Sequence, residues 1–170
     1  GAFGGANYND VSYESKYLNV SSDVGSVIGL NLGTTINAVP GLRAELELAH
    51  RTNDVDIVIC EDWRIGATDE TWSLMANAVY DFETKTWPVH PYLLAGAGYG
   101  SRTGSVPEFS YEVSNRGFAW QVGGGLTTAI AEGVTADLGY RYFQAPELNA
   151  GPVNAGGENH SIVAGLRLTF

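Results

Sequence analysis

Apolar and polar residues alternate with a period of two along most of this 170-residue chain. In the last ten residues, SIVAGLRLTF, every second residue from Ile162 to Phe170 is apolar, and only Val163 breaks the small or polar set between them. This period predicts a β-strand with one apolar and one polar face. Clusters of Gly, Asn, Asp and Pro separate the chain into eight such runs, and none has a sustained helical period. The predicted strands cover residues 2–11, 24–37, 42–53, 71–83, 89–102, 117–130, 134–145 and 159–170.

The connections between the predicted strands alternate strictly in length. Three are short (38–41, 84–88 and 131–133) and four are long (12–23, 54–70, 103–116 and 146–158). The strands themselves, about 10 to 14 residues each, exceed the roughly 5 to 6 residues usual in soluble sandwiches. At a tilt near 40°, about ten residues rise roughly 25 Å, the height of the apolar band of an outer-membrane barrel. Short turns at one end and long loops at the other are typical of a transmembrane β-barrel.

The polar face of the predicted strands carries four positive and four negative charges. If the apolar face meets lipid, these charges are enclosed, and enclosed charges must be paired and hydrogen-bonded. Alternation by itself also fits a soluble lipocalin-like barrel, but the loop asymmetry, the strand length and the charge balance favour the membrane. The first and fifth strands are rich in Gly and Ala, and their faces stay unassigned. The predicted interior ion network contains Arg43, Glu45, Glu47, Arg51, Asp81, Asp137, Arg141 and Arg167.

Aromatic residues fall near both ends of the predicted strands. Amphipathic rings gather at the two lipid–water interfaces of membrane barrels, which predicts two aromatic girdles. The alternative explanation is the general preference of strands for aromatic side chains. The girdle at the long-loop end would contain Trp72, Tyr99, Phe118, Trp120, Tyr140 and Tyr142, and the other would contain Tyr80, Phe82, Trp87, Tyr92 and Phe170.

Composition narrows the class of protein further. Charged residues make up 16% of the chain, below the roughly 25% of ordinary soluble domains. The net charge of −10 argues against a nucleic-acid partner, which would need a basic face. The single Cys60 excludes an internal disulfide framework and a Cys-based zinc site. No run approaches the roughly 18 to 20 apolar residues of a membrane helix, and no leader is apparent, so we expect a mature chain.

Candidate catalytic and metal-binding residues are few. Glu158, His160 and Ser161 are the residue types of a lipid-modifying enzyme, but adjacent side chains of a strand point to opposite faces, which is poor geometry for a nucleophile and its base. We therefore predict no enzyme and no cofactor. The long connections are acidic, for example at Glu61 and Asp62. A solvated surface is the favoured interpretation, and weak Ca²⁺ or Mg²⁺ capture is the alternative.

Several segments together resemble a known family. YLLAGAGYG (92–100), FAWQVGGGLT (118–127), VTADLGYRYF (134–143) and the closing SIVAGLRLTF are similar to the small outer-membrane barrels of Gram-negative bacteria, namely opacity-type surface antigens and the transmembrane domain of outer-membrane protein A. The resemblance implies one domain over residues 1–170 in the bacterial outer membrane. Its fold would be all-β, an eight-stranded antiparallel up-and-down barrel with short periplasmic turns and long extracellular loops. The assembly signal would be Leu166, Leu168 and Phe170, read by the barrel-assembly machinery.

The family has no single activity, so the resemblance implies a fold more than a function. We expect a non-enzymatic barrel that has a structural and surface-interaction role through four extracellular loops. Eight strands leave an interior just wide enough to be filled by side chains, which would plug the lumen. Outer-membrane lipid and lipopolysaccharide would surround the barrel, and the loops would meet an unknown extracellular ligand. A narrow low-conductance pore is the alternative, and a lipid-modifying enzyme is less favoured.

Overall fold

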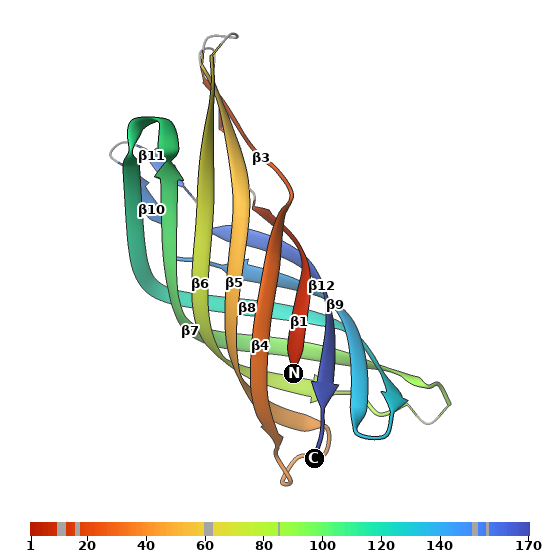
Figure 1. Ribbon diagram of the computed structural model, residues 1–170. Coiled ribbons are helices and arrows are strands. Elements are labelled where there is room, and N and C mark those ends of the chain that lie inside the picture. Colours follow the sequence, from red (N-terminus) through yellow and green to blue (C-terminus); the bar gives the residue numbers. More distant parts are fainter. Residues whose placement is uncertain (10–12, 16–17, 60–62, 85, 151–152, 156) are drawn as a thin grey trace.

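Eight antiparallel strands close into a barrel in the computed structural model (Figure 1). The structure describes residues 1–9, 13–15, 18–59, 63–84, 86–150, 153–155 and 157–170. The barrel strands are β1 (Ala2–Asn9), β4 (Gly25–Thr35), β5 (Leu42–Ile59), β6 (Trp63–Asp81), β7 (Val89–Val106), β8 (Tyr111–Ala131), β9 (Val134–Gln144) and β12 (Glu158–Leu168). Each pairs with the next along the chain, and β1 closes the sheet against β12, with Ala2 opposite Leu166. The predicted eight-stranded antiparallel barrel is confirmed.

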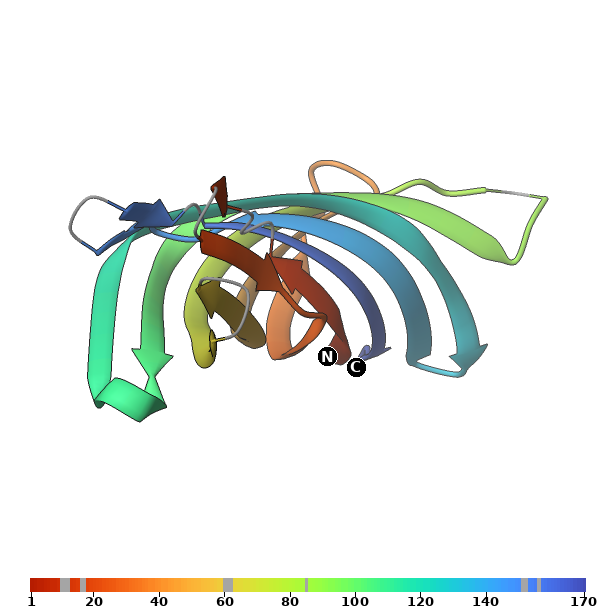
Figure 2. The ribbon, with the colours of Figure 1, turned by 90° about the horizontal axis from the view of Figure 1, so that it is seen from above.

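The two ends of the barrel differ. Both chain termini lie side by side at the end that carries the short turns (Figure 2), where the Thr169 N–H donates to the Gly133 carbonyl. Two of these turns use glycine in the left-handed region, Gly41 at φ 82° and Gly133 at φ 69°, where other residues are strained. Beyond the barrel, the structure has β2 (Tyr13–Ser15), β3 (Leu18–Ser22), β10 (Leu148–Ala150), β11 (Val153–Ala155) and the 3₁₀ turn η1 (Pro107–Phe109). No helix in the described residues is long and apolar enough to cross a membrane.

At the end opposite the short turns, the strands run further than the sequence predicted. Strands β5 and β6 stay paired as far as Ile59 opposite Trp63, so most of the predicted loop 54–70 is a hairpin extension. Strands β7 and β8 stay paired to Val106 opposite Tyr111, which replaces most of the predicted loop 103–116. The loop prediction was wrong there because it ended each strand where the outward residues became polar. Antiparallel backbone hydrogen bonding continues whether the side chains are apolar or polar.

Side chains alternate between the outside and the inside of the wall. On β5, Leu48 is 46% exposed, whereas Glu47 beside it is fully buried. The same order holds on the other strands, whose exposed apolar residues include Ile28, Leu30, Leu74, Leu93, Leu126, Leu138, Ile162 and Leu166. The apolar face of the strands is therefore the outer surface of the barrel, as the sequence predicted.

The structure also assigns the faces of the first and fifth predicted strands. Strand β1 turns Phe3 and Asn7 inward, and β7 turns Leu94 and Arg102 inward. Tyr92 is two residues from Leu94, so its side chain also points inward, and it is only 5% exposed. Its placement in an aromatic girdle was therefore wrong. Glycines on the neighbouring strands make room for its ring, since a Cβ at Gly125 would lie 2.9 Å from a Tyr92 ring carbon.

Candidate functional site in the barrel interior

A layer of polar side chains crosses the middle of the barrel around Glu47. The carboxylate of Glu47 accepts hydrogen bonds from Arg141 Nη1 at 2.6 Å and from Asn77 Nδ2 at 3.1 Å. It also accepts one from Gln121 Nε2 at 3.2 Å, and this amide donates to Asn77 Oδ1 at 2.8 Å. All four residues are buried and come from β5, β6, β8 and β9. This central layer (Glu47, Asn77, Gln121 and Arg141) supplies the charged pair with the hydrogen bonds that buried ions require.

Aromatic rings hold the two arginines near the central layer. The Arg141 guanidinium lies 4.1 Å from the centre of the Phe3 ring, and that of Arg51 lies 3.8 Å from the Phe143 ring. Arg51 Nη1 also donates to Ser73 Oγ at 2.9 Å. Cations are attracted to ring faces, more so away from water. Among the described residues Arg51 has no carboxylate within 4.0 Å, so the structure does not bring this predicted member into an ion pair.

The remaining predicted charges lie toward the short-turn end. Arg43 is at ion-pair distance, 3.2 Å, from both Glu45 and Asp81. Within the described part of the chain, Asp137 and Arg167 form no ion pair shorter than 4.0 Å. Both line a small pocket whose volume is about 20 Å³, which is room for about one water molecule. The other polar residues that line this pocket are Asn31, Arg43, Glu45, Tyr92 and Arg141.

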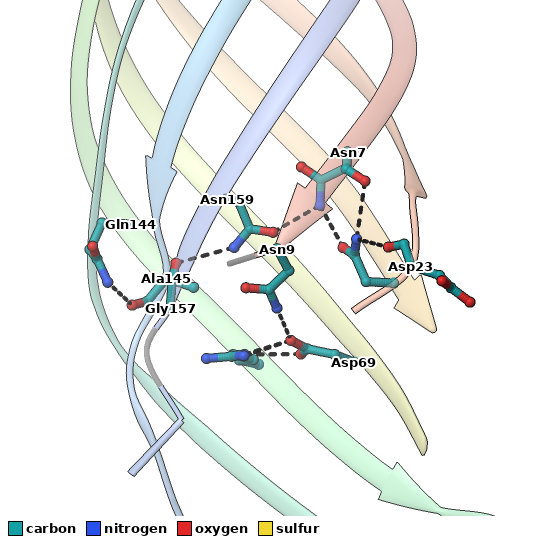
Figure 3. Close-up of polar contacts among 10 residues, drawn as sticks. Asn7, Asn9, Asp23, Asp69, Gln144, Ala145, Gly157 and Asn159 are labelled. Atoms are coloured by element: carbon teal, nitrogen blue, oxygen red, sulfur yellow. Dashed lines mark hydrogen bonds and ion pairs between the residues drawn. The ribbon is translucent and has the colours of Figure 1, made fainter. Parts of the chain in front are cut away.

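An ion pair that the sequence analysis missed lies at the opposite end of the lumen. Arg102 donates two hydrogen bonds to the Asp69 carboxylate, from Nε at 2.9 Å and from Nη2 at 2.6 Å. Asn9 Nδ2 donates a third to the same carboxylate at 2.6 Å (Figure 3). Asp69 was assigned to a loop, but it has the same parity on β6 as Ser73 and Asn77. Extending that alternation by one residue pair would have found it. Arg102 ended a predicted strand whose faces were unassigned.

Uncharged amides complete this end of the lumen. Asn7 Nδ2 donates to Asn53 Oδ1 at 2.5 Å and to Asn159 Oδ1 at 2.8 Å (Figure 3). Ser161 Oγ donates to Asn7 Oδ1 at 2.6 Å. Because these side chains are uncharged, the charge balance of the polar face did not predict them. We call the whole set the outer layer, which consists of Asn7, Asn9, Asn53, Asp69, Arg102, Asn159 and Ser161.

The candidate catalytic residues lie on opposite sides of the wall. Ser161 is buried inside with Asn7. His160 faces outward, with Nδ1 2.5 Å from the Tyr140 hydroxyl, and Glu158 is exposed. Among the described residues, no group of three or more His, Cys, Asp or Glu side chains is arranged to hold a metal ion. Residues 60–62, which include the only cysteine, lie outside the described residues.

Apart from Tyr92, the predicted girdle and assembly residues are on the outer surface. The exposed members are Trp72, Tyr80, Phe82, Trp87, Tyr99, Phe118, Trp120, Tyr140, Leu166, Leu168 and Phe170. Tyr142 is half-buried, with its ring centre 5.3 Å from that of Trp120 and 5.3 Å from that of His160. Their outward placement is compatible with both roles, which remain predictions.

Comparison with known proteins identifies the family. The model of the outer membrane protein beta-barrel domain matches residues 1–170. Among solved structures, the crystal structure of Neisserial surface protein A superposes with a TM-score of 0.69 at 21% sequence identity, covering 99% of this chain and 96% of that chain. No curated protein matches the chain. At this identity the structural likeness shows the fold, and the family model spans the whole chain. The chain therefore belongs to the outer membrane protein beta-barrel domain family and is a β-barrel protein of the bacterial outer membrane.

Proposed function

We propose that this is a single-domain, non-enzymatic surface barrel whose lumen is closed by side chains and whose hairpin extensions present an interaction surface outside the cell. The observation that supports a closed lumen is the fully buried Glu47, which is held by residues of three other strands. The interior of an eight-stranded barrel is only wide enough for side chains. One layer of four residues is therefore sufficient to reach across it.

Opening the central layer would separate a buried ion pair. The attraction between the two charges is stronger in the buried lumen than it would be across water. This supports a plugged barrel over the alternative, a narrow low-conductance pore.

Planar-bilayer recording tests the closed lumen. The purified protein, checked for folding by its heat-dependent migration on gels, should insert without producing discrete conductance steps. A large porin recorded in the same bilayer provides the positive control. Reproducible small steps from the unaltered protein would contradict the plugged lumen and support the pore.

The placement of Ser161 and His160 supports a non-enzymatic role. A nucleophile and its base must lie within hydrogen-bond reach, but the wall separates these two side chains. Lipopolysaccharide and phospholipid incubated with the protein should therefore keep all their acyl chains, as measured by mass spectrometry. Acyl loss or transfer that disappears in Ser161→Ala would support the lipid-modifying enzyme instead.

The paired extensions of β5–β6 and β7–β8 support the surface role. They project beyond the barrel at the end opposite the termini (Figure 1). The similar fold of Neisserial surface protein A belongs to a protein that is named for its location at the surface. The proposed partners are outer-membrane lipid and lipopolysaccharide around the outer face, an unknown extracellular ligand at the extensions, and the barrel-assembly machinery at Leu166, Leu168 and Phe170.

Epitope tags test the orientation that the surface role requires. A tag inserted after Glu108, in η1, should be detected by antibody on intact cells. The matched control is a tag after Glu132, in the β8–β9 turn, which should be detected only after the outer membrane is permeabilised. Detection of the Glu132 tag alone on intact cells would contradict the proposed surface.

A further inference from the structure

The outer layer crosses the lumen separately from the central layer. Its hydrogen bonds join β12 to β1, β1 to β5, β1 to β6 and β6 to β7, and no residue belongs to both layers. On β5, Asn53 is six residues from Glu47, or about 20 Å along the strand at roughly 3.3 Å per residue. On β9 and β12 the two layers come closer, because Arg141 of the central layer lies directly opposite Ser161 of the outer layer. The two layers are therefore separate sets of hydrogen bonds that adjoin on one side of the barrel.

Apolar side chains lie inside the barrel next to β8 and β9, two of the strands that the hydrogen bonds of the outer layer do not reach. Phe143 and Ala145 pack with Met75 and Ala119 in one buried cluster, on the side formed by β8 and β9. Gly100 on β7 lies against Pro146, since a Cβ there would be 2.9 Å from the proline Cδ.

The outer layer is also held by the backbone at its rim. Asn53 Nδ2 donates to the Asp23 carbonyl at 3.3 Å, and Asn159 Nδ2 donates to the Gly157 carbonyl at 3.1 Å (Figure 3). These carbonyls lie just before β4 and β12, where the chain returns to the barrel. Because these side chains are bonded to both the wall and the rim, opening the outer layer would break contacts that the central layer does not make.

From these contacts we infer that the lumen is closed by two separate seals in series, the central layer and the outer layer, and that either one blocks ions. This inference rests on the proposed closed lumen and adds that disrupting the Glu47–Arg141 pair does not by itself open a pore. The Asp69–Arg102 pair and Asn7 are assigned the role of a second barrier.

Conductance of paired variants tests the two seals. The central variant is Glu47→Ala with Arg141→Ala, and the outer variant is Asp69→Ala with Arg102→Ala and Asn7→Ala. Removing both partners of each ion pair avoids leaving an unpaired buried charge. We expect both variants to stay as silent as the unaltered protein in planar bilayers and the combined variant to show discrete conductance steps.

Each other outcome has a defined meaning. If either variant alone conducts as well as the combined variant, the layer left intact is not a seal and this inference fails, while the proposed function stands. If the folded combined variant stays silent, other side chains close the lumen and the inference also fails. Conductance by the unaltered protein would contradict the proposed function itself.

A cysteine placed between the layers tests the same inference without disrupting either one. Ser73 lies on β6 midway between Asn77 and Asp69 and is buried. In a Cys60→Ser background, Ser73→Cys should resist a small charged thiol reagent in intact cells until the protein is unfolded. Adding the outer substitutions should make this cysteine reactive, whereas adding the central substitutions should not. Rapid labelling with both layers intact would overturn the inference.

Discussion

The two faces of the barrel wall put neighbouring residues of the same strand in opposite surroundings. On β5 the apolar Leu48 is 46% exposed, and the charged Glu47 next to it is completely buried. A water-soluble barrel would reverse this order. Here the outer face meets hydrocarbon, which favours apolar side chains. The inner space tolerates the buried Glu47 carboxylate because Arg141, Asn77 and Gln121 donate hydrogen bonds to it. The comparison shows that buried and apolar are separate properties in this fold.

Removing a charge from the inner face should have the largest effect. Arg141→Leu leaves the buried Glu47 carboxylate without its cationic partner, which should lower the free energy of unfolding by about 3 to 5 kcal/mol. Urea titrations in detergent or lipid would measure the loss. An unchanged titration midpoint would mean that the pair contributes nothing, and the contrast between the faces would not hold.

Adding a charge to the outer face should have the next largest effect. Leu138 is 58% exposed near the middle of β9, so Leu138→Arg should cost about 2 to 4 kcal/mol in lipid, the usual cost of arginine near the bilayer midplane. Titrations in lipid vesicles are needed because detergent adapts to the charge. A variant as stable as the parent protein would show that Leu138 does not face hydrocarbon.

A conservative change at the same outer position is the matched control. Leu138→Ile should cost less than about 1.5 kcal/mol because the volume is kept and the site meets fluid lipid. If Leu138→Ile proves more damaging than Arg141→Leu, then Leu138 is packed in a core and Arg141 is wetted. The inner and outer faces would then be the wrong way round.

The smallest effect on stability is expected at the chain end. Phe170 is fully exposed and follows β12, so Phe170→Ala should refold in detergent almost as well as the parent protein. Its assembly in cells should nevertheless fall, as measured by the heat-resistant species on gels, if the terminal aromatic serves recognition. Equal losses in both assays would assign Phe170 to folding stability instead.

Much of the fold could be predicted from strand parity. Alternation put Glu45 and Glu47 on one face and Leu46 and Leu48 on the other. The loop asymmetry, the strand length and the charge balance then predicted that the charged face lies inside, and the structure agrees. The direction of a side chain was predicted wrongly or not at all where the strand boundary was misplaced or where neither face of the strand was clearly apolar. Asp69 was missed because the predicted strand began at residue 71, whereas β6 begins at Trp63. Tyr92 was misplaced because the residues around it are small or apolar on both faces.

The two-faced character of each of the eight strands could be predicted from the sequence, because alternation is a local property that each strand expresses independently. Which inward residues meet could not be predicted, because it depends on how the strands come together in the closed barrel. Glu47 and Arg141 are 94 positions apart, and their contact depends on the tilt and stagger of the strands when the barrel closes. The same closure put Arg51 over the Phe143 ring rather than against a carboxylate. It also brought the uncharged Asn7, Asn53 and Asn159 into one buried cluster, because a shared level in the lumen follows from the register of every pair of strands around the barrel.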